Sequence, residues 1–212
     1  MGARISYYRI REGASLPGIL AQYYTVFRHW SLDADKASRQ EFDEPLIDER
    51  LVTYLEEHPG PAFAPPADPR LANELLGEFV AEAYGWTPDG EQVFLPVSPF
   101  LNKWCYENSN GLVEQTGDAA LVRLWNYIIK GRSLVDGADY HGYGGDFTIG
   151  FLDAGGQLEL KTLITQHFGD LAANAGLHVA EFLDGEPPGA GLGYVLQAIE
   201  EAAGSVLVAQ IE

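Results

Sequence analysis

The sequence has little cysteine and no long apolar run, and both features restrict where it can work. Cys105 is the only cysteine, so no intrachain disulfide can form and nothing indicates an oxidising compartment. The opening stretch MGARISYYRIREG lacks the apolar core of a signal peptide, and no segment approaches membrane-spanning length. We therefore expect a soluble cytoplasmic protein, and the preference for Arg over Lys is common in GC-rich bacteria.

Positive charge is also scarce, above all in the last third of the chain. The formal net charge is −18, from 13 basic and 31 acidic residues. Lys161 is the only basic residue between Ser133 and Glu212, where twelve of the acidic residues lie. A surface of one sign repels nucleic acid and anionic membranes and attracts basic proteins. We therefore expect a basic protein partner, and no binding to nucleic acid or to membranes.

The candidate binding residues are aromatic and acidic residues of this C-terminal third. Tyr140 and Tyr143 lie in a glycine-rich segment, and exposed aromatic side chains are typical of contact surfaces. The candidate acidic contacts are Asp136, Asp153, Glu159, Asp184 and Glu186. Because acidic residues here alternate with apolar ones, we expect the charge to lie on a folded surface rather than on a disordered tail.

The sequence contains no catalytic motif of high specificity. In the segment DYHGYGGD, His141 could be a general base oriented by Asp139 or Asp146, or the three could hold a divalent metal. A glycine-rich loop whose polar residues face water is the alternative. His167 and His178 are too widely spaced to complete a zinc motif, so we expect neither a metal nor a cofactor.

Hydrophobic periodicity predicts a strand followed by helices in the first part of the chain. Residues 3–10 are rich in β-formers and predict the strand, and apolar residues at helical spacing predict a helix over 16–30. The polar stretch SLDADKASRQEFDE predicts a loop. A second helix is expected from Pro45, with Leu46 on its buried face.

Cap residues indicate three further helices in the middle of the chain. They begin at Asp68 and Ser98, each followed by Pro, and at Asp118. The Pro-rich stretch 58–69 is either a linker or a crossing within one domain. We expect a crossing, and hence a single domain over residues 1–212, because the preceding residues are too few for a good independent core.

Alternating apolar residues predict a hairpin in the C-terminal third. Phe147 to Phe151 alternate on one strand, residues 158–162 alternate on the other, and DAGG supplies a turn. A helix over 193–204 and a strand over 205–211 follow. We therefore expect an α+β fold, with a helical N-terminal and central part packed against a mainly antiparallel sheet in the C-terminal third.

One segment resembles a known family. LPVSPFLNKWCYENSNG, residues 95–111, is similar in outline to the stretch of LP, helix and NG found in the SMI1/KNR4-like (SUKH) immunity proteins. The similarity covers 17 residues, and the start of the chain shows no counterpart to the rest of that pattern. The resemblance implies a binding protein that neutralises a toxin.

Three functions are therefore open. The first is a non-enzymatic acidic protein of the immunity or inhibitor type, which neutralises a basic partner and is steered to it electrostatically. The second is a small hydrolase, with or without a metal, that uses Asp139, His141 and Asp146. The third is a DNA mimic of the anti-restriction type, for which the acids would have to follow phosphate-like spacing.

Overall fold

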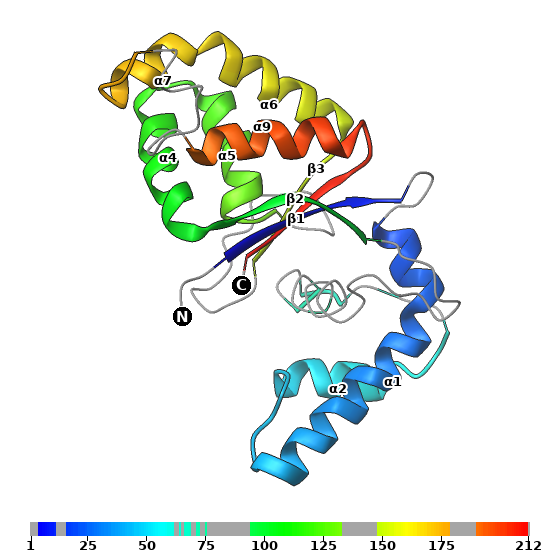
Figure 1. The fold of residues 1–212 in the computed structure, drawn as a ribbon. Coiled ribbons are helices and arrows are strands. Elements are labelled where there is room, and N and C mark those ends of the chain that lie inside the picture. Colours follow the sequence, from blue (N-terminus) through cyan, green and yellow to red (C-terminus); the bar gives the residue numbers. More distant parts are fainter. Residues whose placement is uncertain are drawn as a thin grey trace. The chain divides into compact units, whose positions relative to one another are not determined.

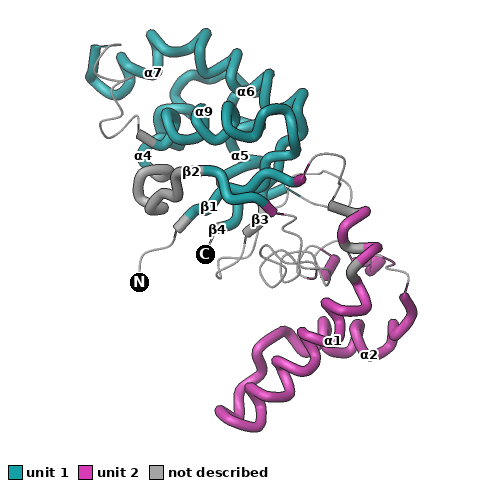
Figure 2. Tube along the Cα trace, turned by 45° about the vertical axis from the view of Figure 1, so that its right-hand side comes forward, with its two compact units in different colours: residues 1–10, 95–133, 138–212 teal, residues 11–94, 134–137 magenta. Residues whose placement is uncertain are grey.

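The computed structural model divides the chain into two compact units (Figures 1 and 2). It describes residues 4–11, 16–61, 64, 66–68, 71–72, 75, 94–132, 148–178 and 190–211. Unit 1 comprises residues 1–10, 95–133 and 138–212, and unit 2 comprises residues 11–94 and 134–137. The Pro-rich stretch 58–69 therefore falls inside unit 2. The single domain over residues 1–212 stays a prediction.

A four-stranded sheet combines segments from the beginning, middle and end of the sequence. Its order is β2 (Phe94–Asn102), β1 (Arg4–Ile10), β4 (Leu207–Ile211) and β3 (Thr148–Leu152). Strand β4 runs antiparallel to both neighbours. The predicted first and last strands are confirmed, and so is the α+β class. The strands are spread along the chain, however, and are not gathered in its C-terminal third.

Five described helices of unit 1 lie on one face of this sheet (Figure 1). They are α4 (Lys103–Gln115), α5 (Ala119–Ile129), α6 (Ala154–Gln166), α7 (Phe168–Asn174) and α9 (Ala190–Ala202). Tyr7 of β1 and Leu207 of β4 join Trp125 of α5 in one buried apolar cluster. Burying such large side chains together is the main favourable term that holds the helices to the sheet.

The predicted hairpin over residues 147–162 is wrong in its second half. Strand β3 is present, but the chain then forms α6, because the Asp153 carboxylate caps that helix by accepting a hydrogen bond from Gly156 N–H at 2.8 Å. Gln157, Leu160 and Ile164 share the buried face, whereas Leu158 is 68% exposed. The helical spacing of these buried residues overrode the apolar alternation on which the hairpin rested.

The middle of the chain also differs from the prediction at two boundaries. Strand β2 continues through Ser98 and Pro99, so the helix begins later, at Lys103. It then runs through the NSNG segment, residues 108–111, to Gln115. The helix after Asp118 is confirmed: the Asp118 carboxylate accepts hydrogen bonds from two N–H groups of its first turn.

Unit 2 contains a helical hairpin, α1 (Leu16–Phe42) and α2 (Glu49–Glu57). The loop predicted for SLDADKASRQEFDE, residues 31–44, is wrong, because α1 continues through this stretch as far as Phe42. Its Ala, Lys, Arg and Gln residues are good helix formers, so polarity alone was a poor sign of a loop. Helix α2 begins at Glu49 rather than at Pro45, with Asp48 as its cap, and Leu46 is exposed rather than buried.

Candidate functional site

Most of the predicted site residues lie outside the described residues. These are Asp136, Asp139, Tyr140, His141, Tyr143, Asp146, Asp184 and Glu186. Asp153 and Glu159 are described, and both belong to α6. Asp153 is the cap of that helix, so its carboxylate already has a structural role. Glu159 is exposed on the helix surface. Catalysis or metal binding by the DYHGYGGD segment therefore stays a hypothesis.

Several of the other described acids in the C-terminal third have partners within unit 1. Glu200 on α9 forms an ion pair with Lys161 on α6, at 2.8 Å. Glu201 accepts a hydrogen bond from Gln197 at 2.8 Å, one turn earlier in α9. Carboxylates that already have partners offer less attraction to an incoming basic protein. The charge excess of this third is therefore a weaker guide to a binding surface than the sequence suggested.

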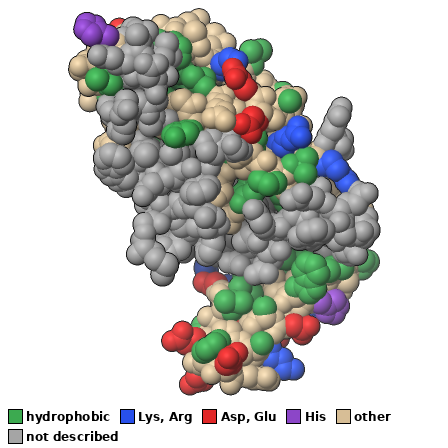
Figure 3. Space-filling view, viewed as in Figure 1, with side chains coloured by type: hydrophobic (Ala, Val, Ile, Leu, Met, Phe, Trp, Pro, Cys, Tyr) green, Lys and Arg blue, Asp and Glu red, His purple; other side chains and the backbone are tan. Residues whose placement is uncertain are grey.

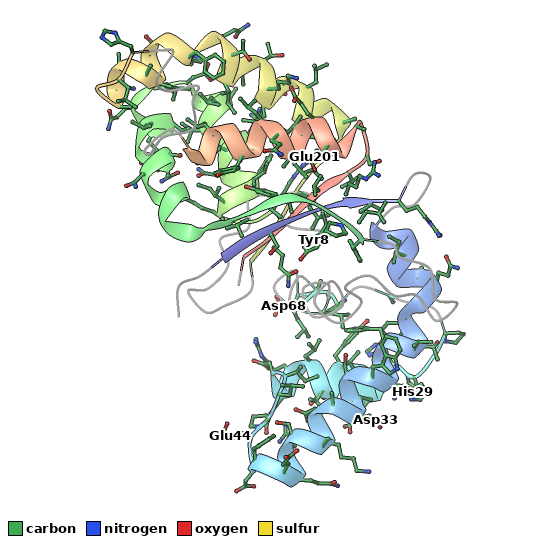
Figure 4. All side chains as sticks on the ribbon, viewed as in Figure 1. Tyr8, His29, Asp33, Glu44, Asp68 and Glu201 are labelled. Carbon is green, nitrogen blue, oxygen red and sulfur yellow. The ribbon has the colours of Figure 1, made fainter. Side chains whose placement is uncertain are left out.

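The α1–α2 hairpin displays a denser group of acids. Nine acidic and three basic residues lie between Asp33 and Glu57. All of the acids except Asp35 are exposed, and Figure 3 shows acidic and apolar side chains interspersed over this part of the surface. Six of them form no ion pair with another described residue: Asp33, Glu41, Asp43, Glu44, Glu56 and Glu57. Asp33 and Glu44 both project outward from the hairpin (Figure 4).

Large apolar side chains are exposed on the same hairpin. Trp30 is 46% exposed, Phe42 is 64% exposed and Leu46 is 53% exposed. Phe42 ends α1, and Leu46 lies in the connection to α2. Leu158 on α6 is the other large apolar side chain that is exposed within the described part of the chain. Apolar exposure therefore concentrates where the acids are dense, a combination that is typical of protein-binding surfaces.

A buried carboxylate fixes the connection that carries Leu46. Asp35, 4% exposed, accepts hydrogen bonds from the backbone N–H groups of Leu46 at 2.8 Å and Ile47 at 3.3 Å. Its second oxygen accepts from Arg39 Nε at 2.6 Å. Burial acts to raise the pKa of Asp35, but the hydrogen bonds from Arg39, Ile47 and Leu46 outweigh it and lower the pKa below its ordinary value. The charged carboxylate thus holds the connection against α1.

An open cleft of about 420 Å³ lies between α1 and α2, and Asp35 and Arg39 are part of its lining. Its lining residues are Leu32, Asp33, Asp35, Lys36, Arg39 and Gln40 from α1, and Val52 and Glu56 from α2. Arg39 also reaches Glu49 at the start of α2, at 3.4 Å. The walls thus combine two apolar side chains with charges of both signs.

Tyrosine contacts anchor the other end of the hairpin. Tyr24 on α1 donates a hydrogen bond from its hydroxyl to His58 C=O, at 3.2 Å, and Arg28 Nε donates to Leu55 C=O. Tyr54 on α2 stacks on the His58 ring at 4.2 Å. Burial, helped by Tyr54 and opposed by Arg28, raises the pKa of Tyr24 to about 12. These contacts hold α1 and α2 together at this end of the hairpin.

A second polar cluster lies in unit 1, where His167 sits between two carboxylates. Its Nε2 is 2.9 Å from Asp118 Oδ2, and its Nδ1 is 3.3 Å from Asp170 Oδ2. Both ring nitrogens therefore face carboxylate oxygens, which favours a protonated imidazole at this position. Within the described ranges, no three His, Cys, Asp or Glu residues form a group that could hold a metal. This cluster links the start of α5 to the junction of α6 and α7.

Comparison with known proteins adds no relative. No protein-family model, curated protein or solved structure matches the chain. None of the helices in the described segments combines the length and apolar character that crossing a bilayer requires.

Sequence reasoning missed the α1–α2 surface because its polar stretch was interpreted as a loop. The spacing of Asp35 and Arg39, one helical turn apart, was the available signal for a helix there. The hydrogen bonds from Asp35 to the connection have no local signature, since they join residues that are eleven and twelve positions apart.

Proposed function

We propose that this chain is a non-enzymatic protein that binds a basic protein partner, and that the α1–α2 hairpin is its contact surface. The observation that carries the proposal is the placement of exposed Phe42 and Leu46 among acids that have no partner of their own in the described structure. Aromatic and aliphatic anchors provide most of the affinity of such contacts, while surrounding charges select the partner and speed its approach.

An immunity or inhibitor role is the concrete form of this proposal. Enzymes that act on nucleic acids have basic substrate grooves, so an acidic hairpin with apolar anchors would be drawn toward such a groove. The similarity of residues 95–111 to immunity proteins agrees with this role, although it lies outside the hairpin. The hydrolase and DNA-mimic alternatives gain no support from the described residues.

The test uses a defined probe, a cationic amphipathic helical peptide composed of Lys and Leu. A peptide with Glu in place of Lys is the control for apolar adhesion. Binding is followed by backbone amide chemical shifts of the full chain at low and at high salt. We expect the Lys peptide to shift the amides of α1 and α2, with an affinity that falls as salt screens the charges.

Paired variants then separate this hairpin from the rest of the acidic surface. Replacing both Phe42 and Leu46 by Ser should weaken binding of the Lys peptide by about thirtyfold, because an anchor residue typically contributes about 1 kcal/mol or more and two are removed. Replacing Leu158 by Ser and Glu159 by Gln removes one exposed apolar side chain and one charge from α6, and should leave affinity unchanged. If the α6 pair weakens binding and the hairpin pair does not, the proposed surface is wrong.

A further inference from the structure

We propose that Asp118, His167 and Asp170 form a pH-sensitive clasp, which ties the start of α5 to the junction of α6 and α7 and loosens as the pH rises. The clasp lies in unit 1 and is independent of the binding proposed for α1–α2. It joins segments that are far apart in sequence, since Asp118 precedes α5 and His167 separates α6 from α7.

The geometry requires a charged imidazole. Carboxylate oxygens accept hydrogen bonds and do not donate them, so each contact of His167 needs a proton on the ring nitrogen. Asp118 Oδ2 faces Nε2 at 2.9 Å, and Asp170 Oδ2 faces Nδ1 at 3.3 Å. Both contacts can be hydrogen bonds only when His167 is an imidazolium. Removal of either proton places a lone pair opposite a carboxylate.

The surrounding charges favour the same protonation state. The hydrogen bond to Asp118 raises the pKa of His167, burial opposes it, and Asp170 raises it further. In return, the N–H of Leu121 and the contact with His167 lower the pKa of Asp118. The other described charged side chains on α4, α5 and α6 are Glu114, Arg123, Lys130, Glu159 and Lys161. The charged side chains that raise the pKa of His167 are Asp118 and Asp170.

Asp170 is the contact that opens first. The Asp170 side chain is 72% exposed, and its distance to His167 is the longer of the two. The Asp118 side chain is 26% exposed, and its other carboxylate oxygen caps α5. His167 precedes α7 without capping it through its side chain. Loss of the Nδ1 proton therefore frees Asp170, in the first turn of α7, while Asp118 remains on Nε2. The segment that loosens is α7 and its junction with α6.

The sign of the pH dependence follows from the raised pKa. The clasp is fully formed below the ordinary histidine value of about 6.5, and its contribution is lost as the pH rises through the higher folded value. The amide protection factors of α7 should fall by at most about tenfold for each pKa unit by which the pKa of His167 in the closed clasp exceeds its pKa in the open one.

The test measures the His167 side-chain resonances and the amide protection factors of α7 in the full chain, from about pH 5.5 to pH 9. We expect His167 to titrate above about 6.5, with α7 protection falling over the same interval. Replacing His167 by Gln should abolish that pH dependence, whereas replacing the exposed His29 on α1 by Gln should leave it intact. Replacing Asp170 by Asn should lower the His167 pKa toward its ordinary value.

Two results would overturn the clasp. One is a His167 that titrates at or below about 6.5 in the wild-type chain, a measurement that needs no variant. The other is an α7 protection profile whose pH dependence survives the loss of the His167 imidazole.

Discussion

Among the glycines whose surroundings the structure describes, Gly150 is the one where an added Cβ would meet the closest contacts. It lies in β3, paired with Ala209 of β4, and α5 packs directly over it. A Cβ at Gly150 would lie 2.1 Å from Tyr127 O and 2.8 Å from Ile128 Cα and Ile128 O. All three atoms belong to the backbone of a helix, so no side-chain rotation can relieve the clash, and α5 must move away from the sheet.

The expected cost of Gly150→Ala follows from this clash. Overpacking in a core typically costs about 1–3 kcal/mol, and a backbone clash belongs at the upper end, near about 3 kcal/mol. For a chain of this size that corresponds to a fall in Tm of roughly 6–12 °C. Urea unfolding, followed by tryptophan fluorescence to which the buried Trp125 contributes, measures the change in the free energy of unfolding.

Gly193→Ala is the matched control. Gly193 is exposed in α9, and a Cβ there would meet nothing within 4 Å. Alanine is favoured over glycine in a helix by roughly 0.5–1 kcal/mol, so this variant should be more stable than the wild type. The close packing of β3 against α5 is refuted if Gly150→Ala is as stable as the wild type.

Two further substitutions test buried polar contacts, both by urea unfolding. Gln157 donates hydrogen bonds from Nε2 to Leu152 C=O at 2.9 Å and to Ser205 C=O at 2.6 Å. Gln157→Leu leaves both carbonyl groups without this donor, so it should lower the free energy of unfolding by about 2–3 kcal/mol. An unchanged urea midpoint would contradict this. Asp35→Asn should cost about 1.5–3 kcal/mol at pH 7, whereas the exposed Asp33→Asn should stay within about 0.5 kcal/mol. Because the pKa of Asp35 is lowered in the folded chain, its contribution to stability is present above about pH 4 and is lost as the pH falls through the folded pKa. The difference in free energy of unfolding between the wild type and Asp35→Asn should therefore become smaller in acid.

Elements with a complete local signal could be predicted from the sequence. The helix after Asp118 combines a cap residue with apolar residues at helical spacing, and the structure buries Leu121, Leu124, Trp125 and Ile128 there. Strands β1 and β4 were recognisable from their β-formers. In each case local propensity and burial favour the same structure, so one sequence window was enough.

Elements with conflicting local signals could not be predicted. The stretch after Asp153 contains both an apolar alternation, at Leu158 and Leu160, and a helical stripe, at Leu160 and Ile164. Packing of α6 against α5 and α9 decides between them, and that information is not local. The candidate surface on α1–α2 depends on another non-local fact, the hydrogen bonds from Asp35 to the connection.

The position of β4 between β1 and β3 has a consequence for folding kinetics. Ile5 pairs with Ile211, so the central ladder of the sheet joins segments separated by almost the whole sequence. Closing so long a loop is entropically costly, and such pairings form slowly. The hairpin of α1 and α2, by contrast, is made from neighbouring segments and can form early. A nascent or partly unfolded chain could therefore present the acidic hairpin before its sheet is complete.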